Sequence, residues 1–149
     1  MIRCVLVATD GSDAALWAVG TAAELAASLG SGARLHVAAA VDYFAVPAML
    51  GKPPPGAPDL LADEARDALE QAEAVIRQAG VRAETHLVYG DVVESVLACA
   101  AEVGADILVA GFRGRSRLAT VVMGSVAGRL VRSTTLPVVI VRRPEAERG

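Results

Sequence analysis

The stretch that decides the fold is residues 2–12, Ile-Arg-Cys-Val-Leu-Val-Ala-Thr-Asp-Gly-Ser. Its first part, Ile2–Ala8, is a short and mostly apolar run, which is typical of a buried strand. The segment after it, Asp13–Leu29, has its few polar residues at helical spacing on one thin stripe, which predicts a helix almost surrounded by protein. Gly30 then ends the helix. A buried strand followed by a buried helix indicates an α/β fold.

The same alternation continues through the rest of the chain. Further strands are expected at 33–41, 81–89, 105–110 and 138–142, and further helices at 63–79, 91–103 and 121–133. Glycines that can end helices follow two of these segments, at Gly80 and Gly104. The pattern predicts an open, parallel, five-stranded sheet with helices on both faces, Rossmann-like, in a single domain spanning residues 1–149.

One segment interrupts this alternation. Residues 47–58 contain Pro53-Pro54-Pro55-Gly56, which neither a helix interior nor a central strand accommodates. We expect an exposed loop here, either a flap over a binding site or a mobile insertion.

Composition narrows the classes of function. The chain has 149 residues, long enough to bury a core without disulfides or metal. Although 54% of its residues are hydrophobic, no charge-free apolar run reaches the length of a membrane span, and the first residues do not form a signal peptide. We therefore expect a soluble, cytoplasmic protein with no membrane partner. A net charge of −3 argues against nucleic acid as a partner.

Cysteines and histidines give no sequence pattern for a metal or redox site. Cys4 and Cys99 lie in apolar surroundings without CxxC spacing, which predicts reduced, buried side chains. His36 and His86 lie far apart along the chain, each alone in a strand-like run, whereas a metal site needs clustered ligands. No metal is assigned.

The richest candidate site follows the fourth predicted strand. Ligands of open parallel sheets bind beyond the carboxyl ends of the strands, and there the chain reads Gly111-Phe-Arg-Gly-Arg-Ser-Arg117, followed by Gly124-Ser125. The glycines let the backbone approach a ligand, and the three arginines of 111–117 can bind phosphate oxygens. A helix beginning near Ser125 would favour an anion.

Two familiar phosphate loops do not fit. A Walker A motif needs Gly-Lys-[Ser/Thr], and the only lysine is Lys52. After the first strand, Asp10-Gly11-Ser12 has too few glycines for a dinucleotide fingerprint. The carboxylate of Asp10 suits a ribose hydroxyl or a divalent cation better than a phosphate.

Together these segments resemble the universal stress protein family along nearly the whole chain. Val5–Ser12 is similar to the family's first strand and its Asp-Gly-Ser tip, and Leu35–Val37 to its second strand. The pattern Gly111-x2-Gly114-x9-Gly124-Ser125 is similar to that of the ATP-binding branch, and Leu136–Arg142 to the last strand. Residues 43–62 have no distinctive counterpart.

The resemblance implies an ATP-binding stress-response protein, with AMP or ADP as alternatives and Mg²⁺ as an accompanying ion. It implies that Asp10 contacts the nucleoside, that the backbone near Val37 reads adenine, and that the glycine motif holds the phosphates. The implied contacts are Ala8, Thr9, Asp10, Val37, Gly111, Arg113, Gly114, Arg115, Gly124, Ser125 and Val126.

The resemblance also implies a homodimer joined through the last strand. An independent physical argument agrees, because Val138–Val141 at an unpaired sheet edge would promote aggregation unless another chain covered it.

The sequence contains no strong catalytic constellation. The serine of Gly124-Ser125-Val126-Ala127-Gly128 is not placed as in a nucleophile elbow, and nothing identifies an attacking group for phosphoryl transfer. We expect a binding protein with at most weak ATP hydrolysis. A nucleotide hydrolase and an interaction module with an empty pocket are the alternatives.

Overall fold

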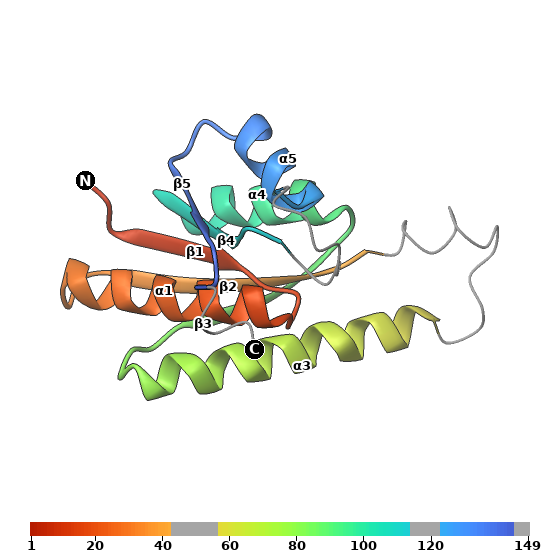
Figure 1. Cartoon of the computed structure of the whole chain (residues 1–149), viewed down its shortest axis with the longest axis horizontal. Coiled ribbons are helices and arrows are strands. Elements are labelled where there is room, and N and C mark those ends of the chain that lie inside the picture. Colours follow the sequence, from red (N-terminus) through yellow and green to blue (C-terminus); the bar gives the residue numbers. More distant parts are fainter. Residues whose placement is uncertain (43–56, 114–122, 145–149) are drawn as a thin grey trace.

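The computed structural model describes residues 1–42, 57–113 and 123–144 (Figure 1). Strands and helices alternate throughout. In chain order they are β1 (Cys4–Ala8), α1 (Asp13–Leu29), β2 (Arg34–Val41), α3 (Ala57–Gln78), β3 (Glu84–Tyr89), α4 (Val92–Val103), β4 (Ile107–Gly111), α5 (Ser125–Ser133) and β5 (Val138–Val141).

The strands form one parallel sheet in the order β3-β2-β1-β4-β5. From β1 the chain first builds outward through β2 and β3, and then returns to place β4 on the other side of β1. The strand order therefore reverses between β1 and β4, which is the switch point where ligands of such sheets bind. β3 and β5 are the edge strands.

Helices cover both faces of the sheet, with α1 and α3 on one face and α4 and α5 on the other (Figure 1). A hydrophobic core lies on each face of the sheet. Residues of β1 contribute to both cores, because successive side chains of a strand point to opposite faces. Val5 and Val7 pack in the core under α1 and α3, whereas Cys4 and Leu6 pack in the core under α4 and α5. The predicted fold class is confirmed.

The start of β1 is fixed by a carboxylate. Asp106 Oδ2 accepts the backbone N–H groups of Arg3, at 2.8 Å, and Cys4, at 2.9 Å. These two hydrogen bonds lower the pKa of Asp106. They attach the beginning of β1 to the segment leading into β4 and so hold the two strands that flank the switch point.

The starts of two helices differ most from the prediction, and the other bounds differ by at most three residues. Helix α3 begins at Ala57 rather than at 63, because a proline in the first helical turn, here Pro58, removes an N–H that would have no intrahelical partner. The predicted loop 47–58 therefore ends before Ala57, and 47–56 lies outside the described residues. Helix α5 begins at Ser125 rather than at 121.

No helix in the described part of the chain combines the length and the apolar character that a bilayer span requires.

Candidate functional site

A pocket of about 240 Å³ opens at the carboxyl edge of the sheet, at the switch point between β1 and β4. Its volume is near the lower end of the several hundred Å³ typical of small-molecule sites. The ends of β1 and β4, the start of α5 and one side of α4 form its walls. Sequence-predicted residues in the lining are Ala8, Thr9, Asp10, Gly111, Arg113, Gly124, Ser125 and Val126.

The turn after β1 is held by its own side chains. Thr9 is buried, and its Oγ1 accepts the N–H of Gly11 at 3.2 Å. Asp10 Oδ1 accepts the N–H of Ser12 at 2.9 Å, and Ser12 Oγ accepts the N–H of Ala15 at 3.2 Å. Gly11 has a φ of 81°, in the left-handed region that favours glycine. These contacts fix the position of the Asp10 carboxylate at the edge of the pocket.

The two described glycines of the motif, Gly111 and Gly124, have packing roles in the fold. A Cβ at Gly111 would lie 3.1 Å from the carbonyl oxygen of Ala14, so glycine at this position lets α1 approach β4 closely. A Cβ at Gly124 would lie 3.1 Å from Arg113 Cα and 3.2 Å from the Phe112 carbonyl oxygen. These glycines bring two segments of the pocket wall together.

Gly124 is also the N-cap of α5. Its own N–H donates to the Phe112 carbonyl oxygen at 2.8 Å, so this N–H is already used within the protein. With no side chain at the cap, α5 lacks the capping hydrogen bond that a serine or aspartate would provide. The first turn of α5, Ser125–Ala127, lines the pocket, so the positive end of the helix dipole lies at the pocket wall.

Cationic and aromatic side chains lie beside the end of β4. Arg113 lines the pocket, with its guanidinium carbon 6.0 Å from the centre of the Phe112 ring. Arg142, which follows β5, lies closer to the same ring, at 4.7 Å. In the described part of the chain, two guanidinium groups therefore lie near the Phe112 ring, and one of them belongs to the pocket lining.

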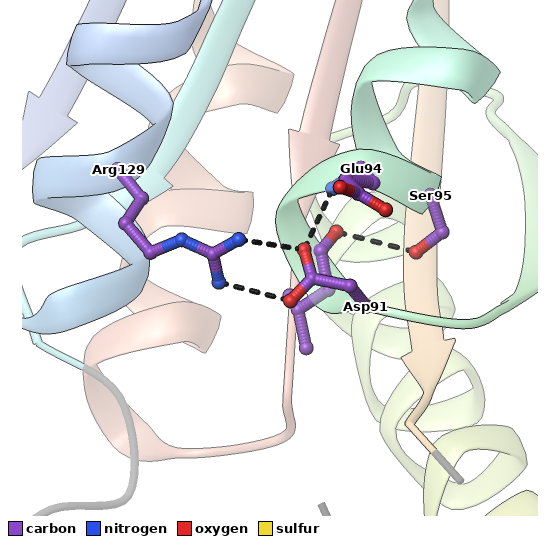
Figure 2. Close-up of polar contacts among 5 residues, drawn as sticks. Asp91, Glu94, Ser95 and Arg129 are labelled. Atoms are coloured by element: carbon purple, nitrogen blue, oxygen red, sulfur yellow. Dashed lines mark hydrogen bonds and ion pairs between the residues drawn. The ribbon is translucent and has the colours of Figure 1, made fainter. Parts of the chain in front are cut away.

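An ion pair joins the two helices on this face of the sheet (Figure 2). Arg129 donates from both terminal nitrogens to Asp91, at 3.0 Å to Oδ1 and 2.8 Å to Oδ2. Asp91 is the N-cap of α4 and also accepts the N–H of Glu94 at 3.0 Å. The bonds from Arg129 and, next, from Glu94 lower the pKa of Asp91. This pair holds the start of α4 against α5, one turn beyond the pocket residues of α5.

Among the described residues, one predicted contact, Val37, is not in the pocket lining. Val37 is fully buried in the core on the α1 and α3 face and lies between β1 and β3 in the ladder. The β2 residues that reach the pocket are its alternating neighbours Ala38 and Ala40. Gly114 and Arg115 lie outside the described residues.

The remaining residues of the pocket lining are apolar, and the sequence did not lead us to predict them. Val92 and Val96 of α4 contribute the broadest apolar side chains, opposite small residues of the sheet. A run of alanines in β2, residues 38–40, was a signal that could have been used, because small side chains on the face under a helix leave room for a ligand. The other lining residues missed are Ala15, Ala110 and Ala127.

The histidines require a correction. Their separation along the chain predicts no cluster of metal ligands. In the fold, however, His36 Nδ1 and His86 Nε2 are 2.9 Å from each other, and Glu84 Oε2 lies 3.4 Å from His36 Nδ1. Residues fifty positions apart become neighbours because β2 and β3 pair in parallel. Burial, and secondarily the neighbouring His86, lowers the pKa of His36.

The prediction for the cysteines is confirmed. Cys4 and Cys99 are both buried and unbridged, and burial raises the pKa of each thiol. Each acts as a small apolar residue in the core under α4 and α5.

Comparison with known proteins gives a consistent family assignment. The model of the Universal stress protein family matches residues 1–142. A universal stress protein of Thermus aquaticus is 34% identical, with 95% of this chain and 100% of that protein covered. One from Methanocaldococcus jannaschii is 29% identical, covering 99% of this chain and 86% of the relative.

Solved structures agree with the sequence relatives. A universal stress protein crystallised in complex with cAMP is 32% identical, covers 93% of this chain and 96% of its own, and superposes with a TM-score of 0.70. A family protein from Burkholderia pseudomallei is 34% identical, with coverage of 93% and 95% and a TM-score of 0.71. The chain belongs to the universal stress protein family.

Proposed function

We propose that this protein binds an adenine nucleotide in the pocket at the β1–β4 switch point and acts as a nucleotide-dependent regulatory protein of the stress response. ATP is the ligand we favour, with AMP, ADP and cyclic AMP as alternatives. The observation that carries the proposal is the glycine-capped start of α5, which lies in the pocket wall together with Arg113.

The phosphates are assigned to this end of the pocket. Backbone N–H groups in the first turn of a helix have no intrahelical acceptors, and the helix dipole adds a partial positive charge. Arg113 adds a full charge and planar donors. The hydroxyl of Ser125, an exposed residue, offers a further hydrogen bond to a phosphate oxygen.

The nucleoside is assigned to the opposite end. Val92 and Val96 form an apolar wall facing the alanines of β2, which suits the faces of a flat base. Asp10 lies at the end of β1, where its carboxylate can accept a ribose hydroxyl. A carboxylate beside the phosphates would repel them, so this division places each charge where it helps binding.

The relative of known structure that holds cAMP supports the choice of an adenine nucleotide, since it is 32% identical over nearly the full chain. A cyclic phosphate and a triphosphate differ in charge and length. The three arginines in 111–117 favour the longer ligand. Mg²⁺ would accompany ATP rather than occupy a separate protein site.

Two further parts of the proposal concern assembly and location. The edge strand β5 consists of Val138-Val139-Ile140-Val141, and we assign the homodimer interface to it because unpaired apolar edges aggregate. The cytoplasm is the compartment that fits two reduced cysteines. Sedimentation velocity tests the dimer, and a single monomeric species at micromolar concentration would contradict it.

Calorimetric titration of the nucleotide-free protein tests the function. We expect saturable binding of Mg-ATP, weaker binding of AMP, and no binding of GTP. Asp10→Ala should weaken ATP binding without changing the circular dichroism spectrum. Absence of binding heat for all adenine nucleotides would reject the proposal.

Hydrolysis is measured in the same sample. Among the described residues, the pocket lining contains one carboxylate, Asp10, and its Oδ1 already accepts the N–H of Ser12. This arrangement supports binding more than catalysis. Phosphate release above that of Asp10→Ala would favour the alternative of a slow nucleotide hydrolase.

A further inference from the structure

A group of side chains that could bind a metal ion lies on the sheet face covered by α4. It is farther from the carboxyl ends of the strands than the proposed nucleotide pocket. In the ladder, His36 of β2 is the partner of Glu84 of β3, and Ala38 is the partner of His86. Side chains two residues apart on a strand point to the same face. His36, Glu84 and His86 therefore share one face of the sheet.

The donor atoms of these residues are close enough to share one ion. His36 Nδ1 is 2.9 Å from His86 Nε2 and 3.4 Å from Glu84 Oε2, and the three ligand atoms all lie within 4.8 Å of one another. Two ligands at the usual distance from a tetrahedral Zn²⁺ lie about 3.3 Å apart. The distance between His36 Nδ1 and Glu84 Oε2 already matches this value. The two distances from His86 Nε2 require adjustments, which the exposed Glu84 and the half-buried His86 can make.

His36 is poorly explained by the stability of the fold. The side chain is 95% buried, and its Nε2 has no hydrogen-bond partner among the described residues. An apolar side chain would fill the same space without an unpaired nitrogen, and unsatisfied buried polar groups in proteins call for a separate explanation. Its other nitrogen, Nδ1, points toward His86 and Glu84.

We propose that His36, Glu84 and His86 bind a divalent transition-metal ion, with Zn²⁺ as the best match. Two imidazoles and one carboxylate form a ligand set that Zn²⁺ accepts, leaving a fourth position for water. Mg²⁺ prefers oxygen ligands and is a poor match. This site is therefore distinct from any magnesium ion that accompanies a nucleotide.

The site is accessible to an ion from the edge of the sheet. The Glu84 side chain is 71% exposed, and β3 is an edge strand. An ion entering there would be held by one rigid, buried ligand and two adjustable ones, and it would join β2 to β3. Ala38, the next residue of β2 on this face, lines the nucleotide pocket, so the two sites are close to each other but share no residue.

The test measures binding of Zn²⁺ to the full chain after removal of metal with a chelator. Competition with a chromophoric chelator should give one Zn²⁺ per chain. Glu84→Gln and His86→Gln should each weaken binding by about 100-fold or more, since even loss of an outer partner costs 10–100-fold. Both positions are at or near the surface, so these variants avoid the folding risk of replacing buried His36.

The matched control is Glu70→Gln, which makes the same change at an exposed position of α3 and should bind Zn²⁺ like the parent. Co²⁺ substitution identifies the ligands, because a thiolate charge-transfer band would show that cysteines bind instead. Three results would overturn the proposal. They are a thiolate band, the absence of a saturable Zn²⁺ site, and equal Zn²⁺ affinity in Glu84→Gln, His86→Gln and Glu70→Gln. In the last two cases, the contact between the histidines would be only a hydrogen bond. Nucleotide binding does not enter this test, so the two proposals fail independently.

Discussion

Helices α1, α4 and α5 each begin at the carboxyl edge of the sheet and line the pocket, but their first turns are capped in different ways. Helices α1 and α4 are capped from within the protein, by Ser12 and Asp91, whose side chains accept N–H groups of the first turn. Helix α5 has Gly124 at the equivalent position and no side-chain cap. Two of the helix starts are therefore stabilised by the protein itself, whereas the third is the one that the proposed function assigns to the phosphates.

The largest effect should come from placing a negative charge at the start of α5. Ser125→Asp adds a carboxylate where the phosphates are proposed to bind, and two like charges about 4 Å apart repel by about 4 kcal/mol near a protein surface. We expect ATP affinity to fall by about 100-fold or more. The same carboxylate favours the helix dipole, so the free energy of unfolding should stay equal or rise by up to about 1 kcal/mol.

Calorimetry and urea unfolding measure the two quantities. Gln71→Glu adds the same charge at an exposed position in the interior of α3 and should change neither. Ser125 is preferred to Gly124 for this test, since any Cβ at Gly124 would approach the backbone of Phe112 and Arg113. Unchanged ATP affinity in Ser125→Asp would show that the open helix start does not hold the ligand.

An intermediate effect is expected at Arg113. Arg113→Gln removes the charge but keeps much of the side chain, and loss of one charge-assisted hydrogen bond costs about 1.5–3 kcal/mol. ATP affinity should therefore fall by about 10- to 100-fold. Arg142→Gln is the control, because Arg142 contacts the same Phe112 ring but does not line the pocket. Equal losses in both variants would point to packing around Phe112 rather than to phosphate binding.

These predictions depend on features that the sequence revealed unequally. The bounds of α1 could be predicted to the residue, because the helical spacing of its few polar residues and the glycine that follows, Gly30, agree. The Gly124-Ser125 segment could be placed near a helix start, and the pocket could be placed at the strand ends. Both followed from local sequence and from general rules of parallel sheets.

What could not be predicted depends on tertiary contacts. The meeting of His36 and His86 follows from the register of β2 against β3, which neither strand encodes alone. The choice of Ala38 rather than Val37 as a pocket residue depends on which face of β2 each helix covers. The contact of Gly111 with Ala14 depends on how closely α1 packs. Local patterns contain none of this information.

A smaller effect is expected when the internal caps are removed. Ser12→Ala and Asp91→Ala each leave one N–H group of a first turn without its side-chain acceptor, which costs about 1 kcal/mol of stability. Asp91→Ala also breaks the ion pair with Arg129. ATP affinity should change much less than in Ser125→Asp. Urea unfolding and calorimetry on both variants make the comparison. If removal of a cap weakened ATP binding as strongly as Arg113→Gln, the capped helix starts would also have to be counted as part of the site.

The smallest effect should appear in acid, where an internal cap can be protonated. The pKa of Asp91 is lowered in the folded protein by Arg129 and by the Glu94 N–H, so its contribution to stability is present above the ordinary aspartate pKa of about 3.9 and is lost as the pH falls through the folded value. Asp91→Asn keeps a capping oxygen but carries no charge. We expect the stability difference between parent and variant, measured by urea unfolding, to shrink as the pH falls below about 4. Because the ion pair reaches solvent, the difference should be small and should decrease with added salt. If the stability difference between parent and Asp91→Asn did not depend on pH, Asp91 would act only as a hydrogen-bond acceptor at the cap. The starts of α4 and α5 would then differ in side-chain hydrogen bonding alone, and the negative charge of Asp91 would have no part in the difference.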